Sequence, residues 1–231
     1  MPIQNPQKRQ IRSFVRRQGR MTPAQKQGLD RYWPRFGLKI SEEPNDFNDI
    51  FGKKSEVVLE IGFGMGDSLL AMAKASPEKD YIGIEVHSPG VGALLSMMAK
   101  EEVSNIRTYQ EDAVAVLNQS IKDGSLAEIN IFFPDPWPKK RHHKRRLIQP
   151  PFVELLTCKL KIGGQIHLAT DWEDYAHQMM AVMSATKGFK NIAGEGKFVK
   201  NQNVRPSTKF EKRGERLGHG VWDLIFIKSD D

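Results

Sequence analysis

The sequence predicts an α/β fold in which helices cover both faces of a mainly parallel sheet. Three observations lead to this prediction. Short apolar runs recur from residue 57 onward, longer segments with helical spacing separate them, and a glycine-rich turn directly follows the first run. A chain of 231 residues can form one such domain with a full core, so we expect a single domain over residues 51–231, preceded by an extension over residues 1–50.

The expected strands are short apolar runs, and the expected helices lie between them. The strands are VVLEI (57–61), YIGIEV (81–86), NIRTY (105–109), INIFF (129–133) and QIHLAT (165–170). The helical segments are SLLAMAKA, GVGALLSMMAKEE, VAVLNQSI, PFVELLTCKL and YAHQMMAVMSA, whose methionines we interpret as core filler. The last apolar run, VWDLIFIK (221–228), is predicted to pair antiparallel at the edge of the sheet.

The first fifty residues are expected to form a basic and partly flexible extension. Residues 1–20 carry six Lys or Arg and no acid, and a helical turn is predicted to start near Thr22 and Pro23. The segment lacks the apolar core of a secretory signal, and no run is long enough to span a bilayer. We therefore expect a cytoplasmic protein, with an Arg-rich mitochondrial presequence as the alternative. The single thiol, Cys158, excludes an internal disulfide and a Cys-based zinc site.

The run LEIGFGMG places Gly62, Gly64 and Gly66 in the turn that leaves the first strand. Glycines there let the backbone approach a ligand closely at the start of the following helix, although such turns also serve packing alone. Asp67 stands where a dinucleotide fingerprint has its third glycine, and its carboxylate would repel a pyrophosphate. Glu60 also disfavours a phosphate but suits a ligand that carries an amine or a sulfonium.

Two further acids follow the next two strands. Glu85 ends the second strand, where α/β cofactor sites place a carboxylate that binds ribose hydroxyls, and Asp112 lies beyond the third strand, where it can accept from an exocyclic amine. Either acid alone is more often a solvated loop residue or a helix cap. Together with Glu60, they converge on the crevice at the strand ends. The sequence therefore predicts a site for a cationic, phosphate-free nucleoside, S-adenosyl-L-methionine.

The fourth strand leads into FFPDPWPKKRHHKRR (132–146), where an acid and an indole precede a dense run of positive charge. Pro134 and Pro136 bracket Asp135 and restrict its loop. Beside a nucleotide-type pocket, and with a net charge of +7, this run favours phosphate contacts over a merely solvated surface. The predicted RNA-contacting residues are Arg141, His142, His143, Lys144, Arg145 and Arg146. Trp137 either stacks on a base or supports the loop. The two histidines lack metal-ligand spacing, so no metal site is predicted.

Five stretches together resemble the bacterial tRNA (guanine-N7-)-methyltransferases, namely LEIGFGMG, GIEVHSPGVG, FFPDPWPKKRHHKRR, HLATDWEDYA and TKFEKRGERLGHGVWDL. The resemblance covers residue 55 to the C-terminus and departs from the family at Pro138, where members have His after the Trp. It implies a Rossmann-like class I methyltransferase with a seven-stranded sheet. It also implies methyl transfer from S-adenosyl-L-methionine to N7 of guanine 46 in the variable loop of tRNA, with S-adenosyl-L-homocysteine as the product.

The resemblance also implies roles for individual residues. Glu60, Glu85, Asp112 and Asp135 would contact the donor, and Asp135 would also be the catalytic residue. Substrate contacts are implied at Lys139, Asp171, Thr208, Lys209, Phe210 and Glu211. Guanine N7 has a lone pair and no proton, so the transfer needs no general base, and the enzyme acts by positioning and by electrostatics.

Two other function classes compete with this interpretation. A non-catalytic RNA-binding protein with a relic cofactor fold would not need the four acids at the strand ends. A methyltransferase that acts on a small molecule or a protein leaves the basic run and the basic N-terminus without a purpose. We therefore expect tRNA as the partner, with no membrane association and no obligate protein partner.

Overall fold

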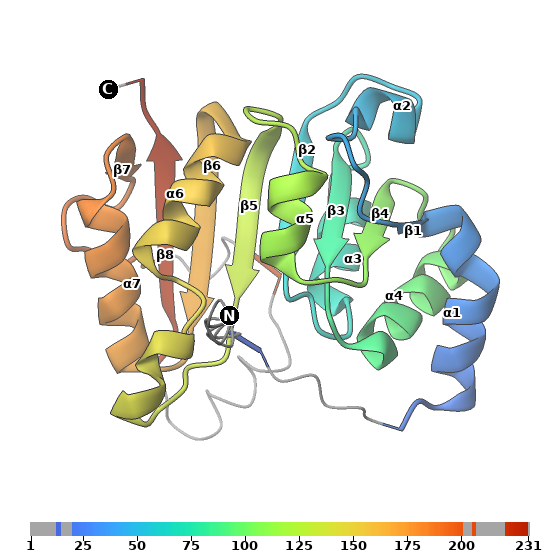
Figure 1. Ribbon diagram of the computed structural model, residues 1–231, viewed down its shortest axis with the longest axis horizontal. Helices are drawn as coiled ribbons and strands as arrows, with labels where there is room; N and C mark the ends of the chain where they lie inside the picture. Colours follow the sequence, from blue (N-terminus) through green and yellow to red (C-terminus); the bar gives the residue numbers. More distant parts are fainter. Residues whose placement is uncertain (1–12, 15–19, 201–204, 207–219, 231) are drawn as a thin grey trace, which may run out of the picture.

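An eight-stranded sheet forms the centre of the computed structural model, which describes residues 13–14, 20–200, 205–206 and 220–230 (Figure 1). The strand order is β1-β4-β3-β2-β5-β6-β8-β7. All strands run in one direction except β8, which pairs antiparallel with both neighbours. The strands are β1 (Gly37–Leu38), β2 (Val57–Ile61), β3 (Asp80–Ile84), β4 (Ile106–Tyr109), β5 (Leu126–Phe132), β6 (Leu160–Thr170), β7 (Phe189–Asn191) and β8 (Trp222–Lys228).

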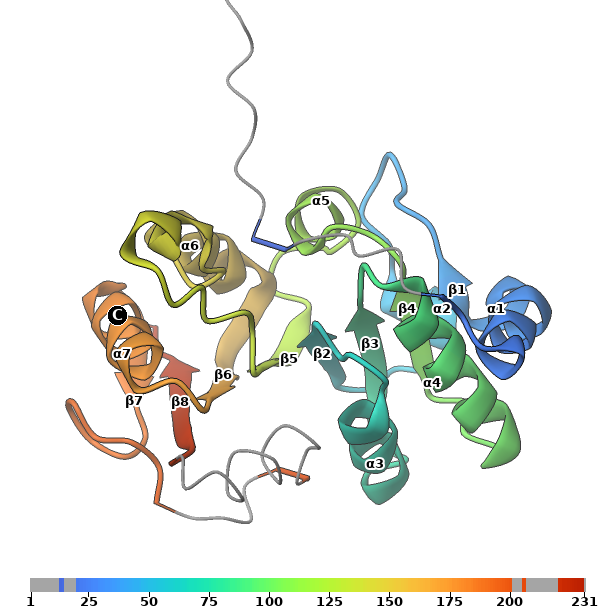
Figure 2. The same cartoon turned by 90° about the horizontal axis from the view of Figure 1, so that it is seen from below.

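Helices cover both faces of the sheet (Figure 2). One face packs against α5 (Ala113–Gln119), α6 (Pro150–Lys159) and α7 (Glu173–Ala185), and the other against α1 (Pro23–Phe36), α3 (Asp67–Ala75) and α4 (Ser88–Lys100). A short helix, α2 (Phe47–Phe51), precedes β2, and a 3₁₀ helix, η1 (Lys140–Arg145), follows β5. In the part of the chain that the structure describes, no helix is both long and apolar enough to cross a membrane.

The central strands are buried on both sides, as a parallel sheet between two helical layers requires. Every residue of β2 and β3 is buried. In the register, Glu60 of β2 lies opposite Gly83 of β3 and Asn130 of β5. Because these strands are parallel and in close register, the loops that leave them open at one common edge of the sheet.

The predicted α/β class is confirmed, and so are the five central strands and the α-helix that follows each of them. Met98, Met179 and Met183 are fully buried, which confirms their interpretation as core residues. The antiparallel pairing predicted for the last strand, β8, is confirmed. The described sheet has eight strands instead of the predicted seven, and the three-residue strand β7 pairs outside β8.

Part of the N-terminal segment belongs to the same layers as the rest of the chain. Thr22 and Gln25 form a capping box, so the predicted helical turn is a full helix, α1. This helix packs along α4, where Gly28 and Gly92 face each other's helix so closely that neither has room for a β-carbon. After α1, β1 pairs with β4. Residues 1–12 and 15–19 lie outside the described residues, and a division at residue 50 stays a prediction.

Candidate active site

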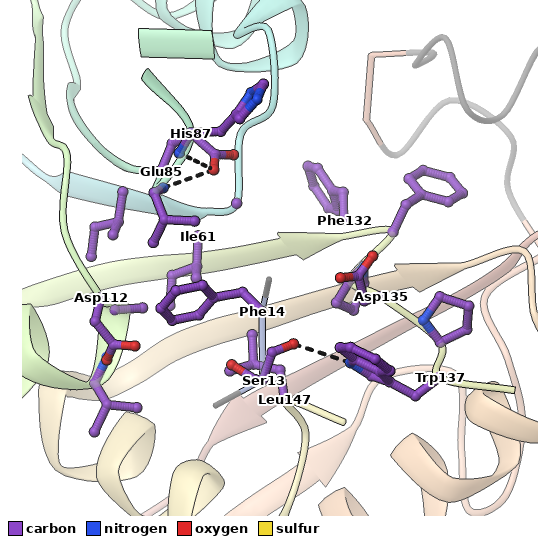
Figure 3. Close-up of a pocket in the computed structure, with 18 of the residues that line it drawn as sticks. Ser13, Phe14, Ile61, Glu85, His87, Asp112, Phe132, Asp135, Trp137 and Leu147 are labelled. Atoms are coloured by element: carbon purple, nitrogen blue, oxygen red, sulfur yellow. Dashed lines mark hydrogen bonds between the residues drawn. The ribbon is translucent and has the colours of Figure 1, made fainter. Parts of the chain in front are cut away.

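A cavity of about 660 Å³ opens at the edge of the sheet where β2, β3, β4 and β5 end (Figure 3). The ends of these strands and the loops after them supply most of its lining, and Ser13 and Phe14 of the N-terminal segment also contribute. Three of the predicted acids, Glu85, Asp112 and Asp135, line the cavity. The structure therefore brings together side chains that lie up to 50 residues apart in the sequence.

The glycine turn after β2 adjoins this site, and its first glycine, Gly62, lines the cavity. Gly62, Gly64 and Gly66 all have a positive φ, between 59° and 87°, which L side chains rarely adopt. The amide of Gly64 donates a hydrogen bond of 2.9 Å to Glu85 Oε2. From the other side, Gly90 of α4 approaches so closely that a β-carbon there would lie 2.0 Å from the carbonyl oxygen of Gly64. The turn is therefore held between the end of β3 and the start of α4.

Glu85 lies directly after β3 and is fixed by backbone amides. Its Oε1 accepts from the amides of Val86, at 2.7 Å, and His87, at 2.9 Å, while Oε2 accepts from Gly64. Burial raises the pKa of this carboxyl, although the three amides favour its charged form. A carboxylate has about four acceptor positions, so Glu85 keeps acceptor capacity toward the cavity.

Asp112 is the N-cap of α5. Its Oδ1 accepts from the amides of Val114, at 2.9 Å, and Ala115, at 3.2 Å. The side chain lies at the opposite end of the cavity from Asp135 (Figure 3). Capping and cavity lining are compatible, because only Oδ1 takes part in the cap.

Glu60 is buried in β2 and is not among the residues that line the cavity. Burial, assisted by the nearby charge of Glu85, raises the pKa of Glu60 to about 8. Its Oε2 has no hydrogen-bond partner among the described atoms. A buried carboxyl of this kind is protonated at neutral pH until a cation comes close.

Asp135 sits in a short loop, residues 134–138, between β5 and η1. Its side chain is exposed at the cavity. Phe133, directly before the loop, and Trp137, within it, are unusual because they are non-glycine residues with φ values of 51° and 43°. Three of the five loop residues are prolines and donate no backbone hydrogen bond. Contacts from elsewhere in the chain must therefore hold the loop.

The basic run after this loop divides into exposed and buried residues. Lys139, Arg141 and Lys144 are exposed, while His142, His143 and Arg145 are half-buried. Arg146 was also predicted to contact RNA, but its side chain is only 1% exposed in this structure. Its guanidinium donates to Pro136 O, Gln178 Oε1 and Asp174 Oδ2. The hydrogen bond from Arg146 to Asp174 also lowers the pKa of Asp174. Arg146 is a structural support of the loop.

Trp137 is engaged on several sides. Its Nε1 donates to the carbonyl oxygen of Ser13 at 3.1 Å, and the guanidinium of Arg145 lies 4.9 Å from the ring centroid. The ring of His142 meets the indole edge-on, at 5.8 Å. Of the two roles considered for Trp137, these contacts favour support of the loop, and they extend that support to the N-terminal segment (Figure 3).

The remaining predicted substrate residues are only partly described. Lys139 precedes η1 and is exposed, and Asp171 is half-buried directly after β6, next to the end of β5. Neither lines the cavity. Thr208, Lys209, Phe210 and Glu211 lie outside the described residues.

Sequence reasoning missed two groups of residues near the site. Ser13 and Phe14 line the cavity but belong to no motif. Arg205, which the sequence shows only as one cation among several, is buried beside Phe133 and paired with Asp223. The only signal for Asp223 is its position as an acid inside an otherwise apolar strand.

Comparisons with known proteins agree on one family. A family model described as "Putative methyltransferase" matches residues 54–224. Among curated relatives, a tRNA (guanine-N(7)-)-methyltransferase of Hydrogenovibrio crunogenus is 55% identical over 95% of this chain and 91% of its own length. Proteins of the same name from Shewanella piezotolerans and Pseudomonas aeruginosa are 57% and 56% identical, over 94% and 96% of this chain and 92% and 91% of their own lengths.

Solved structures share the fold at low sequence identity. The 16S rRNA methyltransferase KamB aligns with a TM-score of 0.59 and 14% identity, over 84% of this chain and 98% of KamB. The aminoglycoside resistance methyltransferase NpmB1 aligns with a TM-score of 0.56 and 15% identity, over 83% of this chain and 95% of NpmB1. The chain therefore shares its architecture with these methyltransferases.

Proposed function

The chain belongs to the tRNA (guanine-N(7)-)-methyltransferase family, and on this premise we propose that it transfers a methyl group from S-adenosyl-L-methionine to N7 of a guanine in tRNA. The family resemblance supports guanine 46 of the variable loop as the target. We further propose that the protein acts in the cytoplasm and without an obligate protein partner.

One observation carries this proposal. A cavity lined by Glu85, Asp112 and Asp135 at the ends of parallel strands lies directly beside a basic 3₁₀ helix. The acids suit a cationic nucleoside without phosphates, whereas the helix suits a polyanion. A donor such as S-adenosyl-L-methionine and an RNA substrate therefore find complementary charge on adjacent surfaces.

The acids of the cavity match the polar groups of the donor. We propose that Glu85 accepts from the ribose hydroxyls with its remaining lone pairs and that Asp112 accepts from the exocyclic amine of adenine. Glu60 is buried in β2, two residues before the glycine turn begins at Gly62. A positive charge near Glu60 would favour its ionised form. We propose that the positions of Gly62, Gly64 and Gly66 bring the backbone close to the donor.

Asp135 is the proposed catalytic residue. Methyl transfer forms the bond to N7 while the bond to sulfur breaks, and positive charge moves from the sulfonium to the purine ring. An ionised carboxylate beside the ring would stabilise this charge, or it would orient the guanine by accepting from N1–H and N2–H₂. In either case, no general base is required, because N7 carries no proton.

The tRNA surface is proposed to include the exposed part of the basic run. Arg141 and Lys144 are exposed in η1, and His142, His143 and Arg145 are half-buried beside them. Substrate contacts at Lys139, Asp171 and residues 208–211 rest on the family resemblance. Arg146 is not part of this surface, because its guanidinium is buried.

Labelled methyl transfer to tRNA tests the proposed activity. The protein is incubated with methyl-labelled donor and bulk tRNA, and the product is then reduced and treated with aniline, which cleaves RNA at N7-methylguanine. We expect one cleavage in the variable loop, and none in a transcript whose guanine 46 is replaced by adenine. Methyl incorporation without aniline cleavage would contradict the assignment to N7.

Asp135→Asn tests the catalytic assignment. Because the neutral amide cannot stabilise the charge that develops on the ring, we expect kcat to fall by about a hundredfold with donor and tRNA still bound. Asp123→Asn is a matched control, since Asp123 pairs with Lys159 where β5 and β6 begin, at the end of the strands opposite the cavity. If Asp135→Asn kept near-full activity with unchanged binding of both substrates, Asp135 would not be the catalytic residue.

A further inference from the structure

Two buried arginines flank the loop that carries Asp135. The side chain of Arg146 is 1% exposed and that of Arg205 is 3% exposed. A guanidinium is retained in the interior only when its charge is paired and its donors are used. The partners of Arg146 and Arg205 therefore show which parts of the structure each arginine connects.

Arg146 ties the far end of the loop to α7. Its Nε donates to the carbonyl oxygen of Pro136 at 2.8 Å, and its two terminal nitrogens donate to Gln178 and Asp174, each at 2.6 Å. The guanidinium also lies 4.8 Å from the ring centroid of Tyr175. Arg146 thus connects a loop carbonyl, one residue after Asp135, to three side chains of a single helix.

Arg205 ties the near end of the loop to β8 and β6. Its Nε donates to Asp223 Oδ1 at 2.8 Å, and a terminal nitrogen donates to Oδ2 at 3.3 Å. Asp223 Oδ1 also lies 2.8 Å from His167 Nε2. Although burial opposes it, the hydrogen bonds from His167 and Arg205 hold the pKa of Asp223 below its ordinary value. The guanidinium of Arg205 lies over the rings of Phe133, at 5.0 Å, and Phe132, at 5.5 Å.

The loop needs such external support. Phe133 has a φ of 51°, which costs energy for a residue with a side chain and persists only where neighbours enforce it. Its backbone amide is bonded to Ala169 O, but Pro134, Pro136 and Pro138 have no amide to donate. Arg205 contacts Phe133 and Arg146 contacts Pro136, so the two arginines hold the chain on either side of Asp135.

We propose that Arg146 and Arg205 are positioning residues for methyl transfer, which together hold the loop so that Asp135 is aimed at the guanine. This inference rests on the proposed function. Neither arginine lines the cavity, and each contacts the backbone or a ring of a residue on either side of Asp135. Because a displacement of about 1 Å can cost up to about a hundredfold in rate, loss of either arginine should lower kcat more than it weakens binding.

The test compares Arg146→Gln and Arg205→Gln with Arg107→Gln. Arg107 is a matched control, because its guanidinium donates to Ser104 O and Ile106 O and lies over Phe36 and Phe51, away from the site. kcat is measured at saturating donor and tRNA, KM for tRNA is measured separately, and thermal melting reports stability. We expect both site variants to lose about tenfold or more in kcat, with KM for tRNA changed less than about threefold. Arg107→Gln should keep kcat within about twofold even where its melting temperature falls.

Lysine variants separate positioning from folding. An ammonium group keeps the charge but cannot span the loop and its anchors at once, so Arg146→Lys and Arg205→Lys should recover melting temperature more than kcat. If kcat of the folded lysine or glutamine variants stayed within about twofold of the unmodified protein, the inference would be overturned. A kcat loss of similar size in Arg107→Gln would overturn it as well, because the losses at Arg146 and Arg205 would then reflect only lower stability. An unmodified protein that formed no N7-methylguanine would instead overturn the proposed function.

Discussion

Burial places the ionisation of Glu60 within the neutral pH range. Its folded-state pKa is about 8, against an ordinary value of 4.5. Between these values the native state holds a proton that the unfolded state has lost, so the free energy of unfolding falls as pH rises. The stabilising contribution is complete below about pH 4.5 and is lost as pH rises through about 8.

Glu60→Gln should flatten this dependence in the unliganded protein. Each pH unit between the two pKa values costs about 1.4 kcal/mol of stability, and the neutral amide carries no such cost. Urea denaturation from pH 5.5 to pH 8 measures the slope in both proteins. Some slope should remain in the variant, because burial also raises the pKa of Glu85. Equal slopes in the two proteins would show that Glu60 does not titrate in this range.

The basic run shows what a sequence reveals at single positions and what it does not. Arg146 and Lys144 look alike in KKRHHKRR, yet one is buried and the other exposed. The partners that bury Arg146, Asp174 and Gln178, lie 28 and 32 residues further along the chain. By contrast, the convergence of Glu85, Asp112 and Asp135 was predictable, because parallel strands end at one edge whatever their distant contacts.

The start of α4 contacts the glycine turn of the proposed donor site through a single close approach. Gly90 lies against the carbonyl of Gly64, where a β-carbon would be 2.0 Å from the oxygen. Gly90→Ala must therefore push the helix and the glycine turn apart. We expect donor affinity, measured by calorimetry, to fall about tenfold or more, because the turn no longer keeps its approach to the donor.

Gly92→Ala is the matched control on the same helix. A β-carbon at Gly92 would lie 2.1 Å from Gln25 O, so this change separates α4 from α1 and leaves the glycine turn alone. The melting temperature should fall, with donor affinity kept within about twofold. Similar losses of donor affinity in both variants would mean that α4 supports the site only through general stability.

The elements that the sequence did not reveal are the short ones. β1 has two residues and β7 has three, and none of these five residues is buried. β1 is a strand because it pairs with Thr108 and Tyr109, and β7 is a strand because it pairs with the end of β8. Neither was predictable from an alternation of apolar and polar residues in its own sequence. The buried strands β2 and β3 were predictable from continuous apolar runs, which a two-sided core demands.

Across the whole molecule, opposite charges occupy adjacent surfaces. The acids line the cavity, whereas the exposed cations of the basic run lie beyond the Asp135 loop, and the chain as a whole carries a net charge of +7. Binding of a polyanion releases counterions, but binding of a nucleoside donor does not. The two substrates should therefore respond differently to salt.

Raising the salt concentration should weaken tRNA binding steeply and leave donor binding almost unchanged. Each phosphate contact contributes about 0.7 to 0.9 to the slope of log Kd against log salt concentration, so Lys144→Ala should reduce that slope by about this amount. Lys161→Ala is the control, because Lys161 pairs with Glu56 where β2 and β6 begin, at the end of the strands opposite the cavity. This variant should not change the slope. Filter binding at several salt concentrations measures both. Equal salt dependence for donor and tRNA, or equal slopes for the two variants, would show that the basic run does not contact the phosphates.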